Sequence, residues 1–117
     1  MITNFETHTE ELSIDELKLV PTFVRAFTKY TKDNPIKAPQ IVERFNANTT
    51  GKKLSEPKLR KIVNHIRSYG LLPLMSTSHG YFVSDEINDI KSQIKSLEER
   101  ARSIQRCADG LKKLINQ

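Results

Sequence analysis

The sequence predicts a mainly helical fold with one small β-hairpin, followed by a long C-terminal helix of the coiled-coil type. Three observations lead to this expectation. Apolar residues recur at helical spacing up to Tyr69, two short apolar runs follow Gly70, and an unbroken heptad pattern occupies the last third of the chain. We therefore expect a flexible acidic arm (residues 1–13), a folded domain (residues 14–84) and a C-terminal oligomerisation helix (residues 85–117).

Composition narrows the class of protein. The chain has 117 residues, of which 37% are hydrophobic and 28% charged, enough for one small domain with an appendage. It has no apolar run near the ~20 residues that cross a bilayer, and its N-terminus lacks the basic start and apolar core of a secretory signal. Cys107 is the only cysteine and forms no intrachain disulfide. We expect a cytoplasmic protein.

The positive charge is concentrated in the middle of the chain. Residues 1–20 contain five acids and one base, a net −4, whereas residues 21–84 contain eleven bases and three acids, a net +8. A cationic field of this kind attracts polyanions. At this level of argument, nucleic acid, an anionic membrane surface and an acidic protein all remain open as partners.

The first two helical segments have recognisable starts. Ser13 and Glu16 match a capping box, which predicts a short helix over residues 14–20. Pro21 either ends this helix or opens the next one, whose apolar stripe extends to Thr31.

Two more helices follow a stop at residues 32–35. Pro39 suits the first turn of one helix, and residues 36–37 before it are long enough only for a brief strand pairing. After the turn "NANTTGKK", Ser55 is a candidate N-cap for the other helix and Gly70 a candidate C-terminal glycine.

The spacing of the apolar residues changes after Gly70, from helical spacing to short continuous runs. The runs "LLPLMS" and "GYFVS", separated by "TSH", predict a β-hairpin with a four- or five-residue turn, and Pro73 places its strand at an edge. Three helices followed by a hairpin is the order of elements in a winged helix-turn-helix domain.

The helix over residues 55–70 has one apolar side and one basic side. Its inward set is Leu59, Ile62, Val63 and Ile66, its outward arc is Arg60, Lys61, Asn64 and Ser68, and Lys58, His65 and Arg67 flank that arc. No acid follows Glu56, so the outward charges lack the i,i+4 partners usual on a solvated helix. Arg and Lys suit phosphates and guanine edges, and Asn suits adenine. We expect this side to enter a DNA groove; the alternative is a basic solvent face without a ligand.

Two further groups are candidate DNA contacts. The hairpin tip carries hydroxyls and an imidazole at Ser76, Thr77, Ser78 and His79, and Lys52 and Lys53 precede the basic helix. Both groups also have an interpretation without a ligand. The Ser and Thr residues are good turn formers, and Lys52 and Lys53 are ordinary exposed lysines.

The C-terminal segment carries a heptad seam with Ser84 or Asp85 as its N-cap. The seam consists of Ile87, Ile90, Ile94, Leu97, Ala101, Ile104, Ala108, Leu111 and Ile115. A single helix leaves such a seam exposed, at a cost of about 1.5–3 kcal/mol for each large side chain. The regular repeat favours a homodimer or higher oligomer over folding back on the domain, and the flanking residues leave the orientation of the helices open.

At three places the residues match a pattern. The helix has Arg60, Val63, Ile66, Arg67 and Gly70; the hairpin has Ser76, Ser78, Gly80, Tyr81 and Phe82; and the tail has Ser96, Leu97, Arg100 and Ile104. Over residues 36–114 the chain thereby resembles small winged helix-turn-helix proteins encoded by bacteriophages and prophages. The resemblance implies duplex DNA binding in phage DNA replication or gene control, inside a bacterial host cell. The acidic first twenty residues and the apolar "LLPLM" depart from the pattern.

Catalytic and metal-binding motifs are not evident. His8, His65, His79 and Cys107 fall in four separate segments, without the spacing of a zinc site, and the four glycines are isolated rather than gathered in a phosphate loop. We expect neither an enzyme nor a bound cofactor or metal.

Two functions stay open. The first is double-stranded DNA binding by an oligomer, as a phage-type regulator or replication-origin binder. The second is a protein-interaction adaptor, whose basic domain docks an acidic phage or host replication protein while the coiled coil builds the assembly. A membrane role is disfavoured because no apolar insertion face adjoins the basic one.

Overall fold

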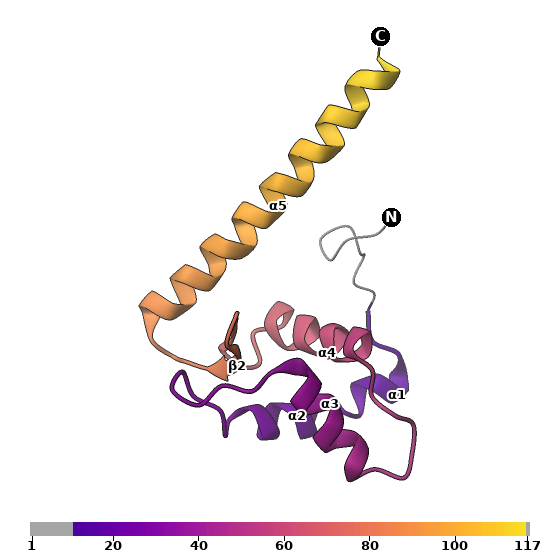
Figure 1. Ribbon diagram of the computed structural model, residues 1–117, viewed down its shortest axis with the longest axis vertical. Coiled ribbons are helices and arrows are strands. Elements are labelled where there is room, and N and C mark those ends of the chain that lie inside the picture. Colours follow the sequence, from indigo (N-terminus) through magenta and orange to yellow (C-terminus); the bar gives the residue numbers. More distant parts are fainter. Residues whose placement is uncertain (1–10, 117) are drawn as a thin grey trace.

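The computed structural model describes residues 11–116, which form five helices and one two-stranded antiparallel sheet (Figure 1). The elements are α1 (Ile14–Leu17), α2 (Val20–Phe27), α3 (Ala38–Ala47), α4 (Glu56–Ser68), β1 (Leu74–Thr77), β2 (Gly80–Val83) and α5 (Ile87–Ile115). The mainly helical class, the hairpin and the long C-terminal helix are confirmed. Residues 1–10, most of the expected arm, lie outside the described residues.

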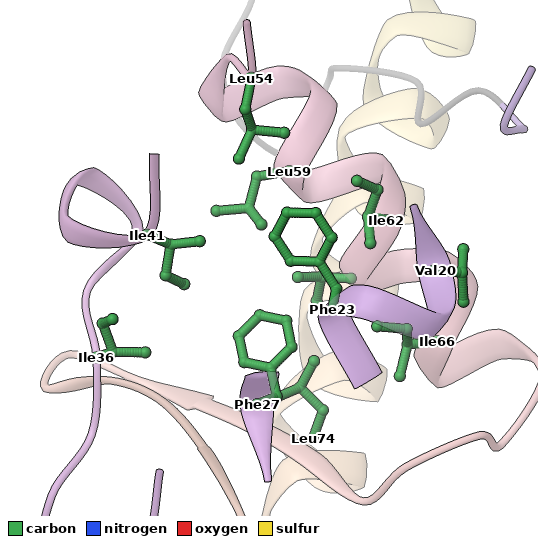
Figure 2. Close-up of a cluster of buried hydrophobic side chains, with 11 residues drawn as sticks. Val20, Phe23, Phe27, Ile36, Ile41, Leu54, Leu59, Ile62, Ile66 and Leu74 are labelled. Carbon is green, nitrogen blue, oxygen red and sulfur yellow. The ribbon is translucent and has the colours of Figure 1, made fainter. Parts of the chain in front are cut away.

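Helices α2, α3 and α4 surround one apolar core (Figure 2). Phe27, Ile62 and Ile66 are at most 2% exposed. Phe23 stacks on Phe45 with ring centroids 5.5 Å apart, and Phe27 meets Tyr81 of β2 edge-on at 5.8 Å. Each fully buried side chain of this size contributes about 1.5–3 kcal/mol. The core therefore fixes which side of α4 faces inward, and with it which side faces out.

The start of the domain follows the predicted capping box. The hydroxyl of Ser13 accepts a 3.2 Å hydrogen bond from the Glu16 N–H, and Glu16 Oε1 accepts a 2.9 Å bond from the Ser13 N–H. Helix α1 ends after one turn at Leu17, earlier than predicted. Pro21 lies in the first turn of α2, where its missing N–H breaks no helical bond.

Both predicted ends of α4 are confirmed. Ser55 is the N-cap, and its hydroxyl accepts from the N–H of Lys58 at 3.3 Å. Beyond the last turn, Gly70 has φ 61°, and the N–H of Leu71 reaches back to the carbonyl of Ile66 at 2.9 Å. This is the Schellman arrangement, in which a glycine takes the left-handed conformation that ends the helix.

The hairpin is tighter than the sequence suggested. Thr77 pairs with Gly80, so the turn holds only Ser78 and His79, not four or five residues. The prediction was wrong because hydroxyl residues are equally at home in an edge strand and in a turn, so composition did not locate the strand ends.

A third segment joins the hairpin. Ile36 and Tyr81 exchange two backbone hydrogen bonds, of 2.9 Å and 2.7 Å, so the brief strand pairing that the sequence left open before α3 is present. The approach is close at Gly80, which has φ 126° and where a Cβ would lie 2.5 Å from the Ile36 carbonyl oxygen. Only glycine fits this position without a shift of the backbone.

Helix α5 leads away from the domain (Figure 1). Its N-cap is Glu86, not Ser84 or Asp85 as predicted. Ser84 instead donates a 2.7 Å hydrogen bond to Asp89, whose carboxylate also accepts from Lys32 at 2.9 Å. The Gln93 side chain accepts from the N–H of Ser76 at 2.8 Å. These contacts attach the first turns of α5 to the domain.

Among the described residues, none of the helices has the length and apolar character needed to span a bilayer.

Candidate nucleic-acid interface

Helix α4 presents the two-sided surface that its sequence predicts. Leu59, Ile62, Val63 and Ile66 are all buried in the core. On the opposite side Arg60, Asn64 and Ser68 are exposed. These three residues, one cationic and two able both to donate and to accept hydrogen bonds, form the free part of the candidate interface.

Lys61 lies on the same side but is not free. Its ammonium donates a 2.8 Å hydrogen bond to Glu16 Oε1 of α1, and the two side chains are only 23% and 12% exposed. The pKa of the Glu16 carboxyl lies below its ordinary value, first because of the hydrogen bond from Lys61 and second because of that from the Ser13 N–H. Helix α1 thus neutralises one of the predicted DNA contacts.

Next to this ion pair is a hollow of about 250 Å³. It is lined by Glu11, Leu12, Leu17, Lys61, Asn64, His65, Ser68 and Tyr69. The His65 and Tyr69 rings lie 4.5 Å apart between centroids. The fold therefore gathers four of the predicted α4 contacts around one hollow, and the N-terminal segment supplies the facing wall.

A second hollow, of about 460 Å³, lies on another side of α1. Lys52, Lys53 and Lys58 line it together with Asp15 and Glu16. Lys53 is partly engaged, because its ammonium donates to the backbone carbonyls of Asn46 and Thr49 at 3.0 Å and 3.3 Å. Lys52 is exposed.

Arg67 is turned toward the hairpin. Its Nε donates a 2.9 Å hydrogen bond to the carbonyl of Leu74, and Nη2 is buried with no hydrogen-bond partner among the described residues. Burial lowers the pKa of the guanidinium and raises the pKa of the nearby Tyr81 hydroxyl. Of the predicted α4 contacts, Arg67 is the one whose charged end is committed inside the fold.

The hairpin tip is open. Thr77, Ser78 and His79 are exposed, and the Thr77 hydroxyl accepts from the His79 N–H at 3.1 Å. Ser76 is half-buried, with its N–H held by Gln93. Three of the four predicted tip residues can therefore reach a ligand.

Most of the α5 seam is exposed, and no residue of the helix is buried. Ile87, Ile94 and Leu111 are 67%, 48% and 67% exposed. Ile90 and Ala108 are half-buried, and Leu97, Ala101, Ile104 and Ile115 are exposed. The described chain itself leaves this apolar stripe without a cover.

Titratable groups suited to catalysis or metal binding are dispersed in the described residues. His65 and His79 lie on α4 and at the hairpin tip, and Cys107 is exposed on α5. Residues 11–116 contain no group of three His, Cys, Asp or Glu side chains placed to hold a metal ion. His8 lies outside the described part of the chain.

Comparisons with protein-family models, with curated proteins and with solved structures found no match to this chain. We therefore infer the function from the geometry of α1, α4, the hairpin and α5.

Sequence reasoning missed the contact between Glu16 and Lys61 and the inward turn of Arg67. A signal for the first existed in the opposite charges of residues 1–20 and 21–84, although it named no pair. For the second, the flank position of Arg67 on the helix gave no indication that β1 would lie beside it.

Proposed function

We propose that the protein is a double-stranded DNA-binding protein of the winged helix-turn-helix type, with α4 as the helix that enters the major groove. The observation that carries the proposal is the free side of α4: Arg60, Asn64 and Ser68 point away from the core, and no acid follows Glu56 on the helix. Major-groove readout uses these side-chain types, with Arg donating to guanine and Asn bridging adenine.

The order of elements and the charge support the same function. Helices α2, α3 and α4 followed by a hairpin match the winged helix-turn-helix order, and the exposed tip residues Thr77, Ser78 and His79 suit phosphate or minor-groove contact. The net +8 of residues 21–84 supplies the attraction for a polyanion. The resemblance to phage and prophage proteins adds a setting, which is regulation or origin binding in the cytoplasm of a bacterial host.

The uncovered seam of α5 supports a homodimer. Pairing two copies would bury the large apolar side chains that the described chain leaves exposed. A dimer carries two α4 helices and suits a two-fold or repeated DNA site.

Binding to duplex fragments tests the function directly. A labelled pool of random duplexes should bind at low salt, and log K should fall linearly with log salt by about 0.9 for each phosphate contact. Arg60→Gln should weaken binding and reduce sequence preference, whereas Arg25→Gln, which removes an equal charge from an exposed site on α2, should do neither. Asn64→Ala should relax base preference with a smaller loss of affinity. No binding at low salt would reject the proposal.

One observation favours a second candidate, the protein-interaction adaptor. Lys61 already holds a carboxylate, that of Glu16, so this side of α4 accepts acidic side chains. In that case an acidic protein partner would dock on α4 and α5 would build the assembly. The duplex experiment separates the two by sequence preference, because the basic surface of an adaptor would hold a duplex only without preference at low salt, and Asn64→Ala would leave that binding unchanged.

A further inference from the structure

We infer that α1 is an intramolecular competitor for the DNA-facing side of α4, with the Glu16 carboxylate occupying the site on Lys61 that a DNA phosphate would take. The inference rests on the proposed function. It adds a regulated contact to the interface: Lys61 becomes available only when Glu16 is displaced.

The Glu16 carboxylate offers Lys61 the same kind of acceptor as a DNA phosphate. A carboxylate and a phosphate both offer anionic oxygens to an ammonium at hydrogen-bond distance. Glu16 Oε1 and Lys61 Nζ are 2.8 Å apart, so a phosphate oxygen and Glu16 compete for the same donor. Because both side chains are largely covered, the pair is a built contact rather than a chance meeting of two mobile surface groups.

The position of α1 also favours competition with DNA. Helix α1 borders both hollows that collect the predicted contacts: Leu17 lines the one with Asn64 and Ser68, and Glu16 lines the one with the lysines of the α3–α4 loop. In Figure 1, α1 lies beside α4. A duplex that reached both groups would have to pass over the segment that carries Glu16.

Helix α1, which covers part of the outward side of α4, is attached to the domain weakly enough to be displaced. Helix α1 is a single turn, and none of its residues is buried. Leu12 and Leu19 on either side of it pack against the core only in part. Breaking a largely covered ion pair is costly only while the lysine is left without a partner, and a phosphate that replaces Glu16 would restore one. A polyanion with many phosphates is therefore able to displace one carboxylate.

Glu16→Gln is a clean test because it removes the charge and keeps the cap. Glutamine at this third helical position accepts the same backbone bond from Ser13 as glutamate does. Asp15→Asn is the matched control: it removes an equal charge one residue away, from a side chain that is 78% exposed and makes only a 3.8 Å contact with Lys18. Both variants raise the net charge by one, so any gain in DNA affinity from long-range electrostatic attraction is the same in both.

The affinities of five full-length proteins for one duplex test the inference: wild type, Glu16→Gln, Asp15→Asn, Lys61→Gln and the double variant of Glu16 and Lys61. Glu16→Gln should bind about fivefold more tightly than wild type, equivalent to roughly 1 kcal/mol, and Asp15→Asn less than twofold. When Lys61→Gln is already present, adding Glu16→Gln should raise DNA affinity no more than Asp15→Asn does. The reason is that the Lys61 ammonium, for which Glu16 and DNA compete, is absent.

Two outcomes would overturn the inference alone. One is an equal gain in DNA affinity from Glu16→Gln and Asp15→Asn, which would show that the change in net charge alone explains the effect. The other is a Glu16→Gln gain that persists without Lys61. If neither wild type nor Glu16→Gln bound duplex at low salt, the proposed DNA-binding function would itself be wrong, and this inference would fall with it.

Discussion

The Nε of Arg67 donates a 2.9 Å hydrogen bond to the carbonyl oxygen of Leu74, which joins the last turn of α4 to the first residue of β1. Arg67→Ala leaves this carbonyl without its charged donor and removes the packing of a half-buried side chain. We expect a loss of about 1.5–3 kcal/mol in the free energy of unfolding, measured by urea titration. Arg60→Ala, on the exposed side of the same helix, should change it by less than about 0.5 kcal/mol. Equal effects of the two variants would show that the Arg67 contact is not structural.

Gly80 lies where the backbone of β2 comes close to Ile36. Gly80→Ala would place a Cβ 2.5 Å from the Ile36 carbonyl oxygen, on a backbone with φ 126°. We expect destabilisation of about 2 kcal/mol or more, from strain and from the loss of the Ile36–Tyr81 pairing. Gly110→Ala is the control, because nothing lies within 4 Å of the added methyl group. It should leave the urea midpoint unchanged or raise it, since alanine favours a helix by about 1 kcal/mol over glycine.

Ile94 is 48% exposed on the α5 seam, a position that pairing would bury. Ile94→Asp would put a charge into that pairing and should convert a dimer to a monomer in sedimentation equilibrium, with the circular dichroism of the domain preserved. Lys95→Asp, one residue outside the seam, should keep the dimer. A wild-type chain that sediments as a monomer at every accessible concentration would contradict self-association through α5.

The pKa of Glu16 predicts a specific acid sensitivity. It lies below the ordinary 4.5, chiefly because Lys61 donates to the carboxylate. A depressed pKa means that the folded state binds this proton less readily than the unfolded chain. The associated stability is complete above the unfolded pKa and is lost as the pH falls from about 4.5 through the lower folded value.

Urea unfolding at pH 7 and at pH 3 checks this expectation. Glu16→Gln should lose less stability than wild type between the two conditions, because it has no carboxylate to protonate. Lys61→Gln should behave similarly, since it removes the main cause of the shift. Parallel losses in all three proteins would show that the ion pair does not contribute to folding in solution.

Features set by local chemistry were predictable from the sequence. The apolar spacing of α4 was confirmed residue by residue, and Ser55 and Gly70 mark its ends as expected. Such signals are readable because a cap or a helical stripe depends on residues within one or two turns. The long C-terminal helix was readable in the same way, although its N-cap was not.

Features set by distant segments were not predictable. The contact between Glu16 and Lys61 joins residues 45 positions apart, and the inward turn of Arg67 depends on where β1 packs. Helical spacing gives the direction of a side chain from its own helix but not what it meets there. The candidate site was therefore right in which side of α4 faces out, and incomplete in what already lies on that side.

The bridge between Ile36 and Tyr81 has a consequence for the route of folding. Helices α3 and α4 lie between these two residues in the chain, so forming the bridge closes a long loop that contains both helices. Contacts of long sequence separation slow the search for the native state relative to simple helical bundles. We expect the hairpin to be a late event, docked onto helices that are already assembled.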